Sequence, residues 1–121
     1  MTERILIVED GEDNRRIMND LLVAAGYEVV LAATGDEGLA LAKAERPDLI
    51  LMDIKLPGMD GLEVTRQIKA EPALQATPVF AVTSYAMSDD NARALAAGCD
   101  AYFSKPVSPR KLLAKIRETL A

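Results

Sequence analysis

The sequence predicts a three-layer α/β fold, in which helices cover both faces of a five-stranded parallel sheet. Short apolar runs rich in β-branched residues alternate five times with segments whose apolar residues recur at helical spacing. These runs lack a polar alternation, which is typical of strands buried on both faces. The connections are short, so each strand and the helix after it form one βα unit of a parallel sheet.

The first strand is Ile5–Val8, which is apolar and mostly β-branched. A helix is expected from about Glu12 to Ala25, because Gly26 suits a C-terminal cap. The second strand is Glu28–Ala32. Apolar residues at helical spacing define the inward face of the first helix: Ile17, Met18, Leu21, Leu22 and Ala25.

The second helix begins where Thr34 and Glu37 have the spacing of a capping box. It must end before Pro47, because the residue preceding a proline is disfavoured in a helix. Four apolar residues from Leu49 to Met52 then form the third strand. Asp53 stands at the end of this strand, where a carboxylate either bonds nearby backbone amides or has a chemical role.

The third helix carries apolar residues from Leu62 to Ile68 and is expected to end near Glu71. Val79–Val82 is the fourth strand. Ser88 can cap the next helix, which is expected to run to Gly98.

Ala101–Phe103 is the fifth strand. Ser108 and Pro109 supply an N-cap and a first-turn proline for the last helix. We therefore predict one domain, residues 1–121, with a doubly wound sheet of the flavodoxin-like type and strand order 2-1-3-4-5.

In such a sheet, ligands bind beyond the C-terminal ends of the strands, at the switch point between strands 1 and 3. Glu9, Asp10 and Asp53 follow strands 1 and 3 at this point. The hydroxyl of Thr83 follows strand 4, and the ammonium of Lys105 follows strand 5. Three neighbouring carboxylates repel one another unless a proton or a cation is bound, and an incomplete set of oxygen ligands suits Mg²⁺. One carboxylate could then attack a phosphoryl group while the hydroxyl and the ammonium stabilise its oxygens.

Each of these residues alone has an ordinary explanation. Glu9 and Asp10 fit a turn before a helix N-terminus, Thr83 fits a capping hydroxyl, and Lys105 fits a solvated lysine. Their coincidence at the strand ends favours a site. Cys99 is interpreted as a small buried side chain without chemistry.

Composition excludes several classes of function. The net charge of −5 argues against a nucleic-acid surface, and no apolar run approaches the ~20 residues of a membrane span. The absence of histidine excludes Ser-His-Asp catalysis and His-ligated metals. No P-loop motif occurs. A single cysteine and an N-terminus without signal-peptide features lead us to expect a cytoplasmic protein.

Five segments carry the motifs of a known family: Ile7–Asp10, Leu51–Asp53, Leu56–Gly61, Val82–Thr83 and Tyr102–Pro106. With these segments, the chain resembles a response-regulator receiver domain throughout. In its Glu9-Asp10 pair and its run Ala81–Met87, it is most similar to the DivK type of single-domain regulator. The acidic pair is Glu9-Asp10 where many members of the family have two aspartates.

The resemblance implies that Asp53 accepts a phosphoryl group from a histidine kinase or a histidine phosphotransfer protein. It implies that Asp10, Asp53 and the carbonyl of Lys55 ligate Mg²⁺, with Glu9 acting through water. Thr83 and Lys105 would bind the phosphoryl group. Lys105–Pro106 is a candidate cis peptide bond.

By the same resemblance, Tyr102 would be a switch residue that rotates inward from an exposed position when Thr83 moves toward the phosphoryl group. A downstream protein would then bind to the face formed by helix 4, strand 5 and helix 5, around Tyr85, Met87, Leu95 and Tyr102. We expect the chain itself to be a monomer or a weak dimer. Lys55 and Tyr85 are expected to limit the access of water to the acyl phosphate.

Three alternatives remain open from the sequence. A phosphatase of the haloacid-dehalogenase type would have a second aspartate where this chain has Lys55. A pseudo-receiver would bind partners without phosphorylation. The chain could also be the receiver domain of a larger regulator or hybrid kinase. For a receiver that is phosphorylated, we expect self-phosphorylation and slow dephosphorylation at Asp53 rather than turnover of an external substrate.

Overall fold

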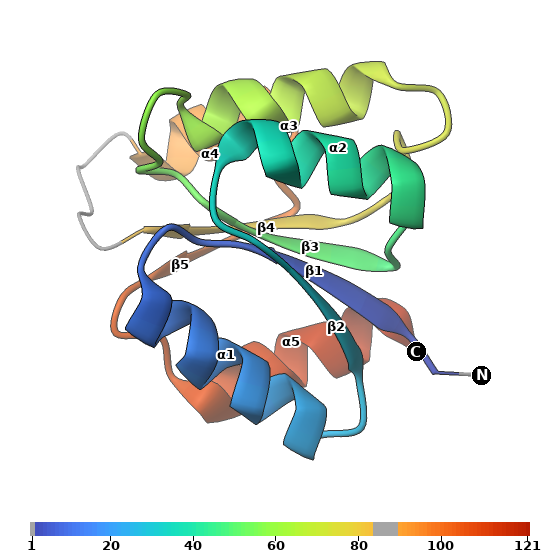
Figure 1. The fold of residues 1–121 in the computed structure, drawn as a ribbon, viewed down its shortest axis with the longest axis vertical. Helices are drawn as coiled ribbons and strands as arrows, with labels where there is room; N and C mark the ends of the chain where they lie inside the picture. The colour runs from blue at the N-terminus through green and yellow to red at the C-terminus, as the bar shows by residue number, and fades with distance from the viewer. Residues whose placement is uncertain (1, 84–89) are drawn as a thin grey trace.

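A five-stranded parallel sheet lies between two layers of helices in the computed structural model, which describes residues 2–83 and 90–121 (Figure 1). The strands are β1 (Arg4–Val8), β2 (Glu28–Ala32), β3 (Leu49–Asp53), β4 (Val79–Thr83) and β5 (Ala101–Ser104). The helices are α1 (Glu12–Ala24), α2 (Gly35–Glu45), α3 (Gly61–Ala70), α4 (Asp90–Ala97) and α5 (Pro109–Leu120). The strand order is β2-β1-β3-β4-β5, so the predicted fold class and topology are confirmed.

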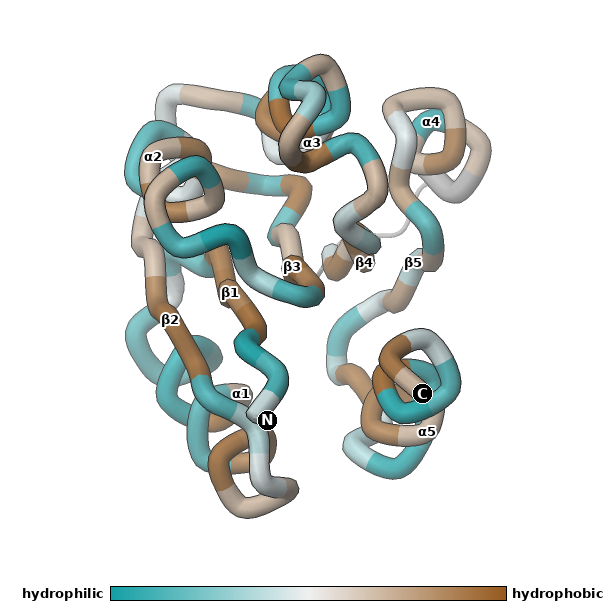
Figure 2. Tube along the Cα trace, turned by 90° about the vertical axis from the view of Figure 1, so that its right-hand side faces the viewer, coloured by the Kyte–Doolittle hydropathy of each residue, from teal (hydrophilic) through white to brown (hydrophobic). Residues whose placement is uncertain are grey.

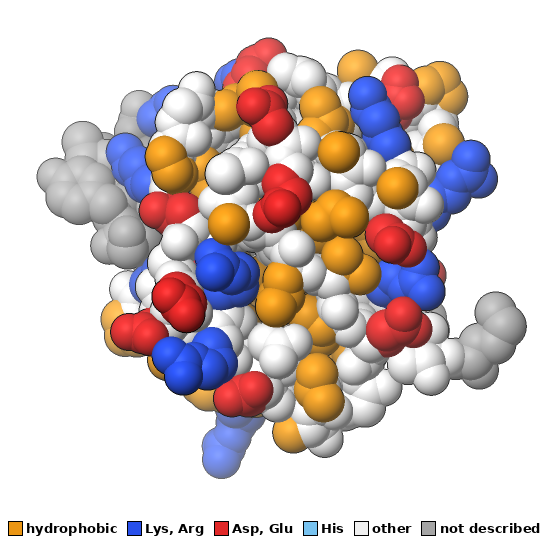
Figure 3. Space-filling view, viewed as in Figure 1, with side chains coloured by type: hydrophobic (Ala, Val, Ile, Leu, Met, Phe, Trp, Pro, Cys, Tyr) orange, Lys and Arg blue, Asp and Glu red, His pale blue; other side chains and the backbone are white. Residues whose placement is uncertain are grey.

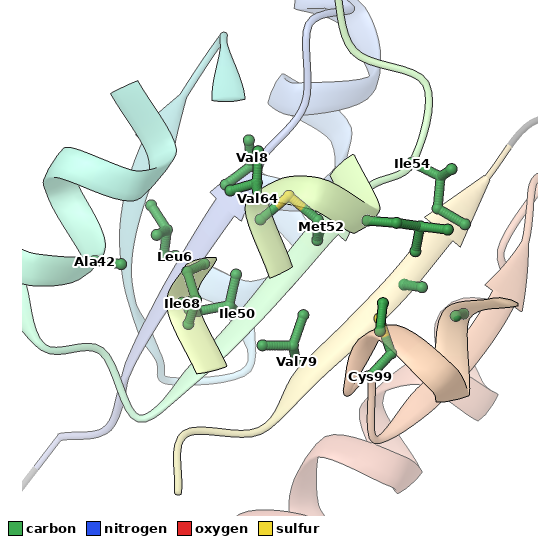
Figure 4. Close-up of a cluster of buried hydrophobic side chains, with 14 of the residues drawn as sticks. Leu6, Val8, Ala42, Ile50, Met52, Ile54, Val64, Ile68, Val79 and Cys99 are labelled. Atoms are coloured by element: carbon green, nitrogen blue, oxygen red, sulfur yellow. The ribbon is translucent and has the colours of Figure 1, made fainter. Parts of the chain in front are cut away.

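The layers follow from the strands being apolar on both faces. Figure 2 shows α2, α3 and α4 on one side of the sheet and α1 and α5 on the other. Successive residues of a strand point to opposite faces, so Leu49 and Leu51 pack with α1 and α5, while Ile50 and Met52 pack with the other three helices (Figure 4). All five residues of β3 are buried, because β1 and β4 also flank its two edges.

Most predicted helix ends are confirmed. The Thr34 hydroxyl accepts a hydrogen bond from the N–H of Glu37 at 3.1 Å, and the Ser108 hydroxyl caps α5. Gly26 has a φ of 97°, a left-handed conformation that suits a glycine after a helix. The Lys105–Pro106 peptide bond is cis, as expected. The predicted cap Ser88 lies outside the described residues.

The expected inward face of α1 is wrong at Ile17. Its side chain is 65% exposed, whereas Met18 and Leu22 are buried against the sheet. A helix can bury only a stripe of its surface against a sheet, and the neighbouring Met18 already occupies that stripe. Ile17 is therefore a surface residue.

Among the described residues, no helix is both long and apolar enough to cross a membrane. On the face shown in Figure 3, acidic and basic side chains are interspersed around hydrophobic ones that gather between α1 and α2, over the edge strand β2. No broad basic surface is seen on this face.

Candidate functional site

The site lies at the edge of the sheet where all five strands end, on the left in Figure 1. Asp53 ends β3, Glu9 and Asp10 follow β1, Thr83 ends β4, and Lys105 follows β5. The parallel topology therefore places residues far apart in the chain on one edge, as the sequence predicted. Four of the five side chains are largely withdrawn from water, and Asp10 is exposed.

Lys105 is the cation that joins two of the buried acids. Its Nζ forms a close ion pair with Oε1 of Glu9 and lies 3.5 Å from Oδ2 of Asp53. The Glu9 and Asp53 side chains are only 2% and 5% exposed, so these interactions act in a poorly solvated environment where charges are felt strongly. The backbone N–H of Lys105 also donates to the carbonyl of Thr83 at 2.6 Å.

Backbone amides hold the two buried carboxylates in place. The N–H of Lys55 donates to Oδ1 of Asp53 at 3.1 Å, and the N–H of Gly11 donates to Oε2 of Glu9 at 3.0 Å. Both oxygens of Glu9 are thus engaged within the protein. Both oxygens of Asp53 have a partner as well, although that to Lys105 is long.

A cation fits this donor set. Glu9, Asp10 and Asp53 each offer a carboxylate oxygen, and these oxygens lie within 4.8 Å of one another. Three oxygens of this kind select a hard ion, and so small a set leaves coordination positions for water and for a phosphoryl group, as Mg²⁺ requires. The exposure of Asp10 leaves the cluster open to solvent on one side.

The pKa values of the two buried acids, Asp53 and Glu9, are shifted in opposite directions. Burial, together with the nearby Glu9 carboxylate, raises the pKa of Asp53 to about 7, against the pull of Lys105 in the other direction. Burial also disfavours ionised Glu9, but hydrogen bonds from Lys105 and from the N–H of Gly11 outweigh it and lower the Glu9 pKa. Without a cation, a proton that binds to this pair of acids therefore resides on Asp53 rather than on Glu9.

The chain after Asp53 is held by a glycine that sequence analysis did not single out. The N–H of Gly61 donates to the carbonyl of Ile54 at 2.9 Å, so the first turn of α3 packs directly on the end of β3. A Cβ at Gly61 would overlap with the carbonyl oxygen of Asp53. Only glycine permits this approach, which fixes the backbone on which Asp53 stands.

The structure differs from the sequence expectation for Tyr102. Its side chain is half-buried, packs against the hydrophobic cluster shared by α2, α3 and α4, and has its hydroxyl oxygen inside. Tyr102 is therefore less exposed here than the resemblance implied, because β5 lies against that core, and its role as a switch residue stays a prediction. Lys55 is exposed, and Tyr85 lies outside the described residues.

Arg15 was also missed by sequence analysis. Its Nη1 donates to the carbonyl of Glu9 at 2.8 Å, although Arg15 belongs to α1. The sequence could have indicated this contact, because Arg15 stands in the first turns of the helix that follows the acidic pair Glu9-Asp10.

Comparison with known proteins identifies the family. Residues 5–117 match the family described as the response regulator receiver domain. The chain therefore belongs to the response regulator receiver domains of two-component signalling, which are generally signalling switches rather than turnover enzymes.

Within that family the chain is DivK-like. It is 46% identical over 120 residues to the polar-differentiation response regulator DivK of Brucella ovis, which covers 99% of this chain and 98% of the relative. A receiver domain protein from Methanospirillum hungatei has a similar structure, with a TM-score of 0.93 and 42% identity, covering 99% of this chain and 94% of the other. The receiver domain of the Pseudomonas aeruginosa sensor kinase PA1611, solved with a magnesium ion coordinated in its active site cleft, has a TM-score of 0.91 and 33% identity, covering 99% and 98%.

The raised pKa of Asp53 predicts a pH-dependent stability. The folded protein keeps a proton on Asp53 that the unfolded chain has already released, so stability falls as the pH rises toward 7. Between pH 5.5 and 8, we expect this group to cost the metal-free protein roughly 2 kcal/mol in the free energy of unfolding. Urea unfolding in the presence of a chelator measures it.

The matched variant is Asp53→Asn, which cannot titrate and should lose this extra slope. Asp36→Asn, an exposed carboxylate at the start of α2, should keep the wild-type slope. Parallel stability curves for wild type and Asp53→Asn would show that Asp53 does not hold the proton.

Proposed function

We propose that the chain is a phosphorylation-dependent switch in which Asp53 accepts a phosphoryl group from a histidine kinase or a histidine phosphotransfer protein. The observation that carries this proposal is the buried Asp53 carboxylate, held between the Lys55 N–H and the Lys105 ammonium and beside two further acids. A carboxylate in such a setting is a nucleophile with cations available for the incoming phosphoryl oxygens.

In the proposed reaction, an oxygen of ionised Asp53 attacks phosphorus, and the bond from phosphorus to the donor's imidazole nitrogen breaks. The N–H of Lys55 holds Oδ1 of Asp53, which restricts the carboxylate to one orientation. Lys105 turns from its carboxylate partners to a phosphoryl oxygen, and the Thr83 hydroxyl donates to another. Bound Mg²⁺ supplies the positive charge that lets Asp53 ionise beside Glu9 and that balances the phosphoryl oxygens.

We propose that Asp10, Asp53 and the carbonyl of Lys55 ligate the Mg²⁺. Glu9 would act through water, which is supported by the engagement of both its oxygens with Lys105 and Gly11. The magnesium ion in the structure of the Pseudomonas aeruginosa PA1611 receiver domain supports the choice of metal.

The output would be a change in the face formed by α4, β5 and α5, which binds a downstream protein. Tyr102 connects this face to the site, since β5 leads directly to Lys105 and the Tyr102 ring packs on the core. Leu95 on α4 is 55% exposed and offers apolar surface to a partner. Tyr85 and Met87, which were expected on this face, lie outside the described residues.

A protein donor also needs a surface beside the site. An apolar hollow of about 180 Å³ lies between α1 and the start of α5, and Lys105 lines it together with Ile17, Pro106 and Leu112. Because Lys105 borders both the hollow and the acidic cluster, a donor seated there would bring its phosphohistidine close to Asp53. We propose this groove as the docking surface of the donor, with the exposed Ile17 as its outer contact.

We propose one receiver domain over residues 1–121, cytoplasmic and acting as a monomer or weak dimer, without a nucleic-acid or membrane partner. The similarity to DivK over 98% of that protein supports the DivK type of receiver. A receiver within a larger regulator or hybrid kinase is the alternative, and PA1611 shows that kinase receivers share this fold. The close grouping of the acids and Lys105 favours a phosphorylated receiver over a pseudo-receiver.

The central prediction is an adduct of one phosphoryl group on Asp53. Incubation with acetyl phosphate and Mg²⁺ should add the mass of one phosphoryl group to the intact protein, and a chelator should prevent it. Asp53→Asn should not form the adduct. An adduct that persists in Asp53→Asn, or forms equally with a chelator, would falsify the assignment.

The switch predicts a localised change on phosphorylation. In hydrogen-exchange mass spectrometry, acetyl phosphate and Mg²⁺ should alter exchange mainly in α4 and β5. Tyr102→Ala should still be phosphorylated at a rate within about twofold of wild type, yet show a smaller change in exchange, because the ring that links β5 to the core is gone. Tyr102→Phe keeps the ring and should behave as wild type. A wild-type change confined to α1 and β2 would contradict this output face.

If the groove binds a protein donor, a substitution in it should slow phosphoryl transfer from a protein but not from a small phosphodonor. Ile17→Glu should slow phosphoryl transfer from a phosphorylated histidine phosphotransfer protein roughly tenfold, the cost of a charge in an apolar contact. Its rate with acetyl phosphate should not change. Val23→Glu alters an exposed apolar residue of α1 that does not line the groove and serves as control. Equal transfer rates for Ile17→Glu and Val23→Glu would exclude this surface.

A further inference from the structure

The turn between β1 and α1 carries Asp10, the exposed acid of the cluster. α1 begins after Gly11, and no side chain caps its first turn. Elsewhere, α2, α3 and α5 each have a capping side chain that fixes the entering backbone. Asp10 has an exposed carboxylate and stands between Glu9 and Gly11, which are joined by the bond from the Gly11 N–H to Oε2 of Glu9 at 3.0 Å. That bond holds the Glu9 side chain, and the carbonyls on either side of Asp10 are held from α1.

Arg15 holds the carbonyls of this turn from within α1. Its Nη1 donates to the carbonyl of Glu9 at 2.8 Å and lies 3.4 Å from the carbonyl of Asp10. The backbone N–H of Arg15 donates to the carbonyl of Gly11 at 2.9 Å, so this residue contacts three successive carbonyls of the turn. On the other side, the N–H of Glu9 donates to the carbonyl of Ala32 at 3.0 Å, which ties the turn to the end of β2.

The geometry has a specific consequence for Asp10. The carbonyls of Glu9 and Asp10 belong to the two peptide planes on either side of the Asp10 Cα. Because a peptide unit is planar, holding both carbonyls with one guanidinium fixes φ and ψ of Asp10 together. These two angles set the direction of the Cα–Cβ bond, and hence where the Asp10 carboxylate points.

We propose that Arg15 is a positioning residue of the Mg²⁺ site, which orients Asp10 through the backbone and touches neither the metal nor the phosphoryl group. This inference rests on the proposed function, since it concerns the metal site of that function. Residues behind the ligands commonly contribute to metal affinity in this way, because they remove the freedom that the ligands would otherwise lose on binding.

The requirement is for arginine rather than for positive charge. A guanidinium is planar and carries its donors in a fixed fork, so it can direct hydrogen bonds to adjacent carbonyls. A lysine would keep the charge behind the acidic pair but offers a single compact ammonium on a flexible stem. Arg15→Lys therefore separates the electrostatic contribution from the positioning one.

The test is calorimetric titration of the metal-free proteins with MgCl₂, at a temperature where circular dichroism shows each variant to be folded. Arg15→Ala should bind Mg²⁺ roughly tenfold more weakly than wild type, and Arg15→Lys should lie between the two. Arg16→Ala is the matched control, since the neighbouring arginine is 64% exposed and pairs with Asp13. It should bind Mg²⁺ as wild type does.

A second readout separates positioning from direct participation. With acetyl phosphate, the phosphorylation rate of Arg15→Ala should reach the wild-type value once MgCl₂ is raised about tenfold, because only metal affinity is impaired. A lower plateau at saturating Mg²⁺ would overturn the positioning role.

Equal Mg²⁺ affinity of wild type and Arg15→Ala would also overturn the inference while leaving the proposed function intact. If Arg15→Ala does not fold, Arg15→Lys decides in its place, and wild-type affinity for that variant contradicts the inference. A wild-type protein that binds no Mg²⁺ and forms no phosphoryl adduct would remove the proposed function and this inference together.

Discussion

The structure depends on an unbalanced group of charges at one edge of the sheet. Two carboxylates are buried there with a third beside them, and the Lys105 ammonium contacts both members of the buried pair. Burial makes this surplus of negative charge expensive, so the group takes up a proton or a cation. Asp53 holds the proton because burial and the nearby Glu9 carboxylate raise its pKa. The protonation of this group of acids therefore changes when a cation binds to it.

The parallel sheet creates this edge and gives its parts different stability. β3 is buried on both faces and flanked on both edges, which holds Asp53 in a rigid centre. β5 is an outer strand, and its residues, Tyr102 among them, are less buried than those of β3. The proposed switch would use this difference, because a change in charge on a rigid strand can be relieved in the less buried strand near it.

Around the acids, much of the control is exerted through backbone. Lys55 and Gly11 offer N–H groups, Gly61 allows α3 to meet the end of β3, and Arg15 holds the carbonyls of the acidic turn. None of these roles depends on a reacting side chain. They keep the carboxylate oxygens within 4.8 Å of one another, and a shift of the turn would separate these oxygens even if every acid remained.

The sequence by itself determined what depends on near neighbours. Helical spacing, caps such as Thr34 and Ser108, and apolar strands ending in polar residues are local, and these sufficed for the five βα units and the topology. Only the tertiary structure decided which acid keeps the proton, that Ile17 is exposed, that Tyr102 is half-buried and that Arg15 reaches back to the turn. Charge coupling and burial arise from distances between segments remote in the chain, and no local pattern encodes those distances.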